Sequence, residues 1–224
     1  MALVEVSAGE EPGPKEVNYV LAALRQGEPV CLPTRFGYIF ACDAINRFAI
    51  RRLRELRNDR NPTGYAVLFC DISQFETFTP PLSSQVRRVL DVYWSQLLTY
   101  RAPKKDLSWD SGDDCRDSYF FARSSSEPFI QQILKSYGPL AISSASAKGW
   151  PSFSSPKLID EQFSGRVQTV IGVGDIVQIG KSTVISELDN GFIVLREGAI
   201  DYLTLVENFP DIKFTLSSEM RDNV

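Results

Sequence analysis

The spacing of apolar residues along the chain predicts five amphipathic helices. In each stretch apolar side chains recur every three or four residues, which places them on one face of a helix. Gly27 stands where the first helix should end, and Asn46 stands where the second should be capped. The predicted helices span Lys15–Arg25, Asn46–Arg57, Ser83–Leu98, Pro128–Tyr137 and about Ala199–Asn208.

Short apolar or alternating runs between these helices predict β-strands. Tyr65–Cys70 is continuously apolar, as in a strand that is buried on both faces. The turn residues Asp189-Asn190-Gly191 separate two alternating runs and predict a hairpin. The predicted strands are Pro29–Leu32, Tyr38–Ala41, Tyr65–Cys70, Ser118–Ala122, Leu140–Ser143, Val167–Val173, Ser182–Glu187 and Phe192–Leu195. Strands interleaved with helices, together with a hairpin, indicate an α/β fold with a mixed sheet.

The remaining segments complete the predicted domain organisation. We expect a single domain over residues 14–209, a flexible tail at 1–13 and a second tail at 210–224. Lys104–Asp117 is polar and acidic and predicts a solvated surface loop, because its aspartates lack the glycine and the terminal glutamate of a calcium-binding loop. Ser143–Pro156 is rich in Ser, Gly and Pro and is long enough to act as a lid.

Composition narrows the class of protein and the kind of chemistry. The 224 residues are 43% hydrophobic and carry a net charge of −4, so contact with nucleic acid would require a local basic patch. The four cysteines lack C-x-x-C spacing, and no apolar run is long enough to span a bilayer. We therefore expect reduced thiols, a cytoplasmic location and no membrane contact. The chain has no histidine, which excludes Ser-His-Asp catalysis and histidine-ligated zinc and leaves hydroxyls, cations and backbone amides.

The segment Gly180-Lys181-Ser182-Thr183 has the letters of a phosphate-binding loop but the wrong context. Asp175 stands where a P-loop needs its first glycine, and the alternating residues after Lys181 predict a strand rather than a helix. Two interpretations remain: ordinary strand residues, or hydroxyls at a strand end that bind an anion. We favour the second, because Arg196 follows across the predicted hairpin.

A series of segments resembles, in family order, the motifs of the YrdC/YciO family, the threonylcarbamoyl-AMP synthases. The resemblance covers the chain from about Lys15 to Ile200. The matching segments are Pro33–Ala44, Arg57–Asp59, Trp94–Thr99, Arg123, Ser143–Gly149, Ser182–Val184 and Arg196–Ile200. The resemblance implies a twisted mixed sheet flanked by helices in a single domain, with a basic concave face.

The resemblance also implies an activity and a set of site residues. L-threonine, bicarbonate and ATP would condense to threonylcarbamoyl-adenylate and pyrophosphate. Mg²⁺ would enter bound to ATP, and the protein itself would ligate no metal. A downstream transferase partner would then modify tRNA. The implied catalytic residues are Arg57, Arg123 and Arg196. The implied nucleotide- and substrate-binding residues are Thr34, Arg35, Tyr38, Arg60, Ser144, Ser146, Ser182 and Thr183.

Five residues depart from the family pattern and leave alternatives open. Arg35 replaces an acidic residue, and Arg57 replaces a lysine, which alters the donor geometry. Phe36 and Ser146 replace a threonine and an asparagine, and Asp59 replaces an arginine that faces anions. A reversed charge about 5 Å from a phosphate changes binding by roughly 6 kcal/mol at an effective dielectric near 20. Either Asp59 points away from the bound anions and Arg60 or Arg35 replaces the family's arginine, or the synthase reaction is altered.

If the synthase reaction is lost, the alternative function is binding of nucleotide or double-stranded RNA through the same cleft. A third possible function is carbamoyl transfer to a different acceptor. The arginine-rich stretch from Arg47 to Arg60 is either a solvated helix face or a footprint for RNA or triphosphate.

Overall fold

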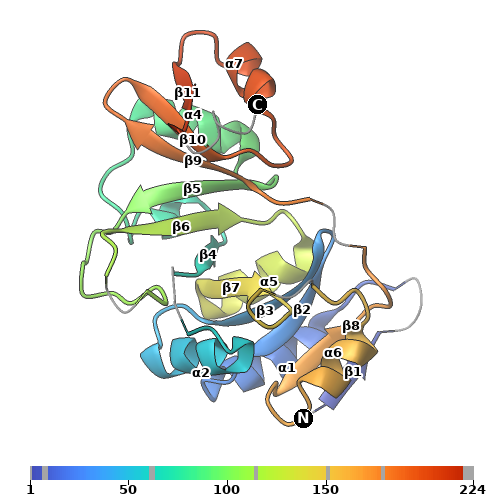
Figure 1. Ribbon diagram of the computed structural model, residues 1–224. Helices are drawn as coiled ribbons and strands as arrows, with labels where there is room; N and C mark the ends of the chain where they lie inside the picture. The colour runs from blue at the N-terminus through green and yellow to red at the C-terminus, as the bar shows by residue number, and fades with distance from the viewer. Residues whose placement is uncertain are drawn as a thin grey trace.

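One mixed, twisted sheet organises the chain (Figure 1). The computed structural model describes residues 2–6, 10–60, 64–113, 116–149, 152–177 and 180–218. Across the sheet the strand order is β1-β8-β2-β3-β7-β4-β6-β5-β9-β10-β11. The strands are β1 (Ala2–Glu5), β2 (Val30–Thr34), β3 (Gly37–Asp43), β4 (Ala66–Phe69), β5 (Leu98–Pro103), β6 (Tyr119–Ser124), β7 (Leu140–Ser144), β8 (Thr169–Gly172), β9 (Thr183–Leu188), β10 (Gly191–Arg196) and β11 (Phe214–Leu216).

The helices divide the core between the two faces of the sheet. They are α1 (Pro14–Arg25), α2 (Arg47–Arg57), α3 (Ile72–Phe75), α4 (Ser84–Tyr93), α5 (Pro128–Tyr137), α6 (Pro156–Gln162) and α7 (Tyr202–Asn208). Apolar residues of α1 and α5 pack together on one face, over β2, β3, β4, β7 and β8. Apolar residues of α2, α4, α6 and α7 belong to the larger cluster on the other face. Among the described residues, no helix is long and apolar enough to cross a membrane.

The α/β fold with a mixed sheet is confirmed, and local signals account for several element ends. The Asn46 side chain accepts from the amides of Phe48 and Ala49 and caps α2 as predicted. Gly27 has a φ of +70°, the left-handed backbone that glycine provides after the end of α1. The predicted hairpin is present, since β9 and β10 pair antiparallel with Leu188 opposite Gly191.

The predicted helix Ser83–Leu98 is too long. The helix ends at Tyr93, and Leu98–Pro103 is instead strand β5. Strand β5 lies between β6 and β9 and pairs with both, so partners distant in the sequence decide its conformation. The sequence prediction also missed the short helices α3 and α6, and α7 begins at Tyr202 rather than Ala199.

Both segments expected to be tails contain strands. Ala2–Glu5 pairs in parallel with β8 from Thr169 to Gly172. Phe214–Leu216 pairs in parallel with β10 and forms the other edge of the sheet. Backbone pairing to an existing edge orders these segments although their sequences are short and carry little periodicity.

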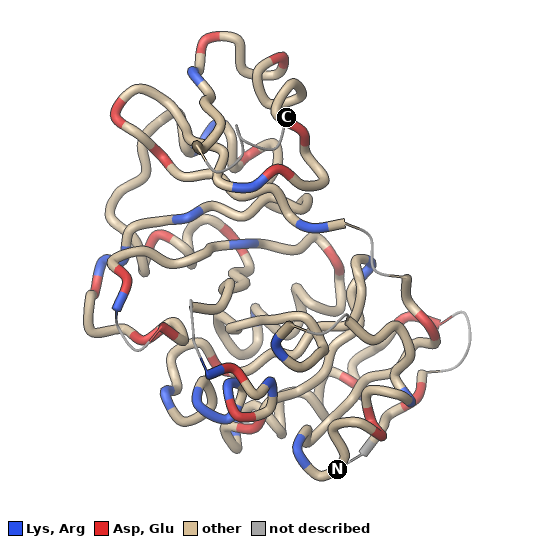
Figure 2. Tube along the Cα trace, viewed as in Figure 1, with Lys and Arg blue, Asp and Glu red and all other residues tan. Residues whose placement is uncertain are grey.

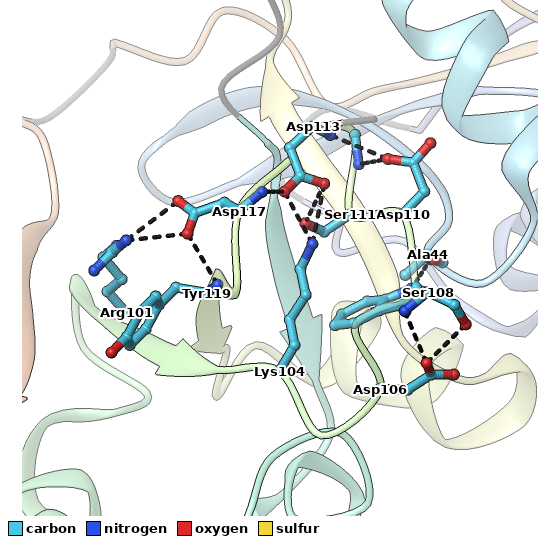
Figure 3. Close-up of polar contacts among 12 residues, drawn as sticks. Ala44, Arg101, Lys104, Asp106, Ser108, Asp110, Ser111, Asp113, Asp117 and Tyr119 are labelled. Atoms are coloured by element: carbon cyan, nitrogen blue, oxygen red, sulfur yellow. Dashed lines mark hydrogen bonds and ion pairs between the residues drawn. The ribbon is translucent and has the colours of Figure 1, made fainter. Parts of the chain in front are cut away.

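The acidic stretch Lys104–Asp117 is only in part the solvated loop that its composition suggested (Figure 3). Residues 105–108 are exposed, whereas residues 110–113 are buried. Lys104 is fully buried, and its ammonium donates to both carboxylate oxygens of Asp113, at 3.0 and 2.9 Å. Asp113 also accepts from the amide of Asp117, and Asp117 pairs with Arg101. Residues 110–113 fold inward because the Lys104 ammonium and the amide of Asp117 stabilise the Asp113 carboxylate. Asp114 and Cys115 lie outside the described residues.

Candidate functional site

A cavity of about 450 Å³ lies against the sheet beside α5. Side chains alternate between the faces of a strand, and Leu68 on β4 lies in the core beneath α1 and α5. Its register partner on β6 is Arg123, which therefore shares that face. Thr99 on β5 and Val184 on β9 are also register partners, and all four residues line the cavity. In Figure 1 α4 lies behind β9 and β10, and no helix lies in front of β5 and β6.

The lining combines cations with hydroxyl groups. Among the described residues the charged lining groups are Arg123, Lys181 and Arg196 against the one carboxylate of Glu127. Hydroxyls of Thr34, Thr99, Ser144 and Ser182 contribute to the same lining. Cationic side chains with surrounding hydroxyl donors are suited to bind carboxylates and phosphates.

Arg123 is a cavity cation that feels the charge of Glu127 but has no hydrogen-bond partner among the described residues. No described residue accepts a hydrogen bond from its guanidinium, and its Nε is buried without a partner. Burial, reinforced by the neighbouring charge of Arg196, lowers the pKa of Arg123 to about 10, so the side chain remains a cation at neutral pH. A partly buried cation without a hydrogen-bond partner is costly, and an anionic ligand would compensate it.

Ser182 and Arg196 form the second polar group of the cavity. The Arg196 guanidinium donates to the Ser182 carbonyl through Nε and Nη2 and to the Ser182 hydroxyl through Nη2. Thr99 donates its hydroxyl proton to the Ser182 hydroxyl oxygen at 2.8 Å. The hairpin register shifts between Val194 and Arg196. This bulge allows Arg196 to line the cavity although Val194, two residues earlier, points into the core on the other face.

Thr183 does not line the cavity. It is fully buried on the opposite side of the strand from Ser182, and its hydroxyl donates to the Ile200 carbonyl. The same oxygen accepts from the amides of Gly198 and Ile200, both at 3.0 Å. Thr183 therefore joins the segment after β10 to the start of β9.

Thr34 and Tyr38 both line the cavity, and their hydroxyls bond to the backbone. Thr34 donates to the Gly37 carbonyl at 2.7 Å, across the turn between β2 and β3. The Tyr38 hydroxyl donates to the Gly174 carbonyl at 2.7 Å and accepts from the amide of Val173 at 3.0 Å. Burial raises the pKa of Tyr38 to about 12. Tyr38 thus borders the cavity and fixes the segment after β8.

Arg35 lies at the rim of the cavity rather than in its lining. Its guanidinium donates to the Ser95 carbonyl and the Ser126 hydroxyl, both at 3.2 Å, and stacks over Phe36. Its amide donates to Oε1 of Glu127 at 2.8 Å. Burial raises the pKa of Glu127, although the Arg35 amide and the charges of Arg35 and Arg123 act in the opposite direction.

Of the predicted site residues at the end of α2 and near the end of β7, only some line the cavity. Ser144 lines the cavity, whereas Arg57 and Ser146 are buried outside the lining and Arg60 is exposed outside it. Arg57 donates to the Ser144 carbonyl. Asp59 also lies outside the lining, where its carboxylate accepts from the ammonium of Lys148 at 3.2 Å. Its negative charge therefore does not face the cavity.

Sequence reasoning missed several lining residues. Thr99 ends the recognised segment Trp94–Thr99 and directly follows the predicted helix Ser83–Leu98, so its place in a strand was not predicted. Lys181 precedes the predicted site residue Ser182, but it was not predicted to bind a ligand because the P-loop interpretation of this segment was rejected. Glu127 precedes Pro128 at the start of α5, and no local signal marks it. Trp150, in the expected lid, lies outside the described residues.

Comparison with known proteins assigns the family. The family model for Sua5, YciO and YrdC, described as telomere recombination, matches residues 22–198. The chain belongs to the Sua5/YciO/YrdC family. The threonylcarbamoyl-AMP synthase of Bacillus subtilis is 25% identical over 186 residues, which cover 83% of this chain and 54% of that protein. That of Pseudomonas putida is 24% identical over 180 residues, covering 80% of this chain and 95% of that protein.

Solved structures of family members share the fold. The chain superposes on Pyrococcus abyssi Sua5 in complex with L-threonine with a TM-score of 0.84 and 19% identity, covering 96% of this chain and 63% of that one. Escherichia coli YciO gives a TM-score of 0.75 and 20% identity, covering 88% and 96%. The chain thus spans about half the length of the Bacillus subtilis relative and under two thirds of the Sua5 chain.

Proposed function

We propose that the chain is a divergent threonylcarbamoyl-AMP synthase, which condenses L-threonine, bicarbonate and ATP to threonylcarbamoyl-adenylate and pyrophosphate. The product would serve a downstream transferase that modifies tRNA. The observation that carries the proposal is the unpartnered Arg123 guanidinium in a cavity lined by hydroxyls. Relatives named threonylcarbamoyl-AMP synthase, and a fold shared with a threonine-bound Sua5, support it.

The donor set of the cavity fits these substrates. Threonine brings a carboxylate, ATP with Mg²⁺ brings phosphates, and bicarbonate is itself an anion. In the proposed reaction negative charge moves to the departing pyrophosphate, which positioned cations stabilise. Arg123 and Arg196 would neutralise that charge, while the hydroxyls of Ser182, Thr34 and Ser144 orient the bound oxygens.

The position of Asp59 removes one objection to synthase activity. The expected penalty required the carboxylate to face the bound phosphates, and Asp59 is paired with Lys148 outside the lining. Asp59 stands where the family pattern has an arginine, and neither Arg35 nor Arg60 lines the cavity to replace that positive charge. The lining cations are instead our candidates to supply it: Arg123, Lys181 and Arg196.

Phe36 favours a second candidate function, a protein that binds nucleotide without synthase chemistry. Phe36 lines the cavity at a position where the family pattern has a threonine. The RNA form of this alternative has less support. In Figure 2 the basic residues of α2 are grouped with acidic ones. Arg51 pairs with Glu55 and Arg52 with Glu28, so part of the suggested footprint is already neutralised.

Pyrophosphate release decides between the two functions. The purified protein is given L-threonine, bicarbonate, Mg²⁺ and ATP, and the adenylate is detected by mass spectrometry. Each substrate is omitted in turn. We expect release that requires all of them and falls at least 100-fold in R123M. The control R88A removes an exposed arginine paired with Asp211 and should match the wild type. ATP binding without release would support the second candidate instead.

A further inference from the structure

The C-terminal end of α2 turns toward the cavity edge formed by β7. Asn58 follows the last helical residue with a left-handed φ of +53°, and the amide of Asp59 donates to the Arg54 carbonyl at 3.0 Å. This turn ends the helix and leaves the Asp59 side chain only 3% exposed. A carboxylate buried to this degree requires compensation by a partner.

Three contacts join this end of α2 to the last residue of β7 and to the segment that follows it. The Arg57 guanidinium donates to the Ser144 carbonyl, and the amide of Lys148 donates to the Arg57 carbonyl at 2.8 Å. The ammonium of Lys148 donates to Oδ2 of Asp59 at 3.2 Å. We call the four residues Arg57, Asp59, Ser144 and Lys148 the clasp.

The clasp holds a lining segment from outside the cavity. Ser144 lines the cavity, whereas the other three residues of the clasp do not. The other backbone hydrogen bonds of this segment are few. The amide of Ala145 donates to the Tyr38 carbonyl at 3.0 Å, that of Ser146 to the Ser144 carbonyl at 2.8 Å, and that of Phe153 to the Ala145 carbonyl at 3.4 Å. The ion pair therefore closes the loop from Ser144 to Lys148 against α2.

The charges of the clasp are mutually dependent. Burial lowers the pKa of Arg57, and the charge of Asp59 opposes that shift. Asp59 Oδ1 and Arg57 Nε are buried without a hydrogen-bond partner, so each charge relies on the few contacts it makes. Loss of the Lys148 ammonium would leave a buried carboxylate with an uncompensated charge, and the loop would move to rehydrate it.

We propose that Asp59 and Lys148 are positioning residues that, with Arg57, fix the Ser144 hydroxyl at the cavity edge. This inference rests on the proposed function for its ligands, because Ser144 is positioned for L-threonine or ATP. The negative charge at position 59 is then a requirement of this chain's loop, since it pairs with the lysine at position 148.

Hydrogen exchange tests the clasp without any activity. Lys148 is the side chain to change, because it is 45% exposed and its loss leaves the core intact. In K148M we expect amides of residues 145–149 to exchange about tenfold faster, while those of residues 140–142 in β7 are unchanged. K148R keeps the cation and should exchange like the wild type. D59N should reproduce K148M. Unchanged exchange in both K148M and D59N overturns the clasp.

A double-mutant cycle tests whether the clasp acts through Ser144. Affinities for ATP and for L-threonine are measured by titration calorimetry. We expect S144A to weaken one of these ligands, and K148M to weaken the same one about tenfold. S144A/K148M should bind no more weakly than K148M alone, because the hydroxyl is already misplaced. Additive losses, or S144A binding both ligands like the wild type, overturn the positioning role.

The proposed function and the clasp fail in different ways. Absence of pyrophosphate release by the wild type contradicts the synthase, yet leaves both the exchange and the binding cycle interpretable. If the wild type binds neither ligand, the proposed function fails and the exchange experiment alone decides whether the clasp exists.

Discussion

Arg196, the last residue of β10, holds Ser182, the residue before β9, by bonds to both its carbonyl and its hydroxyl. The Nε and Nη2 atoms lie 3.0 and 2.9 Å from the Ser182 carbonyl oxygen, and Nη2 lies 2.9 Å from its hydroxyl oxygen. The planar guanidinium thereby fixes both the backbone and the side chain of one lining residue. A lysine has no such fork.

We therefore expect R196A to reduce kcat/KM for pyrophosphate release by about 100-fold, as when one donor of an oxyanion site is lost. R196K should fall between R196A and the wild type, because it keeps the charge and loses the fork. Steady-state kinetics measures both. Activity of R196K equal to that of the wild type would show that charge alone matters at this position.

Replacement of Arg123 should separate stability from binding. R123M removes a partly buried cation that has no hydrogen-bond partner among the described residues, so we expect the free energy of unfolding to rise by about 1 kcal/mol. Affinity for ATP or L-threonine should fall at least tenfold in the same variant. Urea unfolding and calorimetric titration measure the two effects. A large loss of stability would contradict the view that Arg123 awaits a ligand.

The buried pair of Lys104 and Asp113 should behave in the opposite way. Their side chains are 0% and 4% exposed, so K104M leaves a buried carboxylate without its cation. We expect a loss of about 3–5 kcal/mol in the free energy of unfolding. The adjacent, exposed Lys105 supplies the control, and K105M should change stability by less than about 0.5 kcal/mol. Equal urea midpoints for the two variants would refute the assignment.

Asp113 should also contribute to acid unfolding. Burial raises its pKa, but hydrogen bonds from Lys104 and from the amide of Asp117 outweigh burial, so the pKa lies below its ordinary 3.8. A carboxyl group with a depressed folded-state pKa contributes stability that is present above pH 3.8 and is lost as the pH falls toward the folded value. Stability measured below pH 4 should thus decline more steeply in the wild type than in K104M/D113N.

Gly198 should tolerate no side chain. A Cβ there would lie 2.3 Å from the carbonyl oxygen of Lys181 and 2.6 Å from the carbonyl carbon of Ser182. Backbone atoms cannot rotate away, so we expect G198A to cost about 1–3 kcal/mol of stability and to displace the lining residues Lys181 and Ser182. At Gly13 the nearest atom is 3.7 Å away, and G13A should cost under about 1 kcal/mol. Thermal unfolding of the two variants makes the comparison.

The sequence by itself determined the α/β class, most of the helices and the β9–β10 hairpin, because these depend on local periodicity, caps and turn residues. Asn46 and Gly27 illustrate this, since each acts on the helix beside it. The absence of histidine and the motif series also predicted a site built from hydroxyls and cations.

The tertiary structure alone decided which polar residues share the cavity. Strict alternation would place Arg196 on the core side with Val194, and the register shift in the hairpin places it in the lining instead. The structure also corrected the expectations for Asp59 and Thr99. The end of α2 sets the direction of the Asp59 side chain, and the pairing of β5 with β9 sets that of Thr99. Sequence periodicity gives the face of a regular element, but contacts between distant segments fix bulges, helix ends and strand partners.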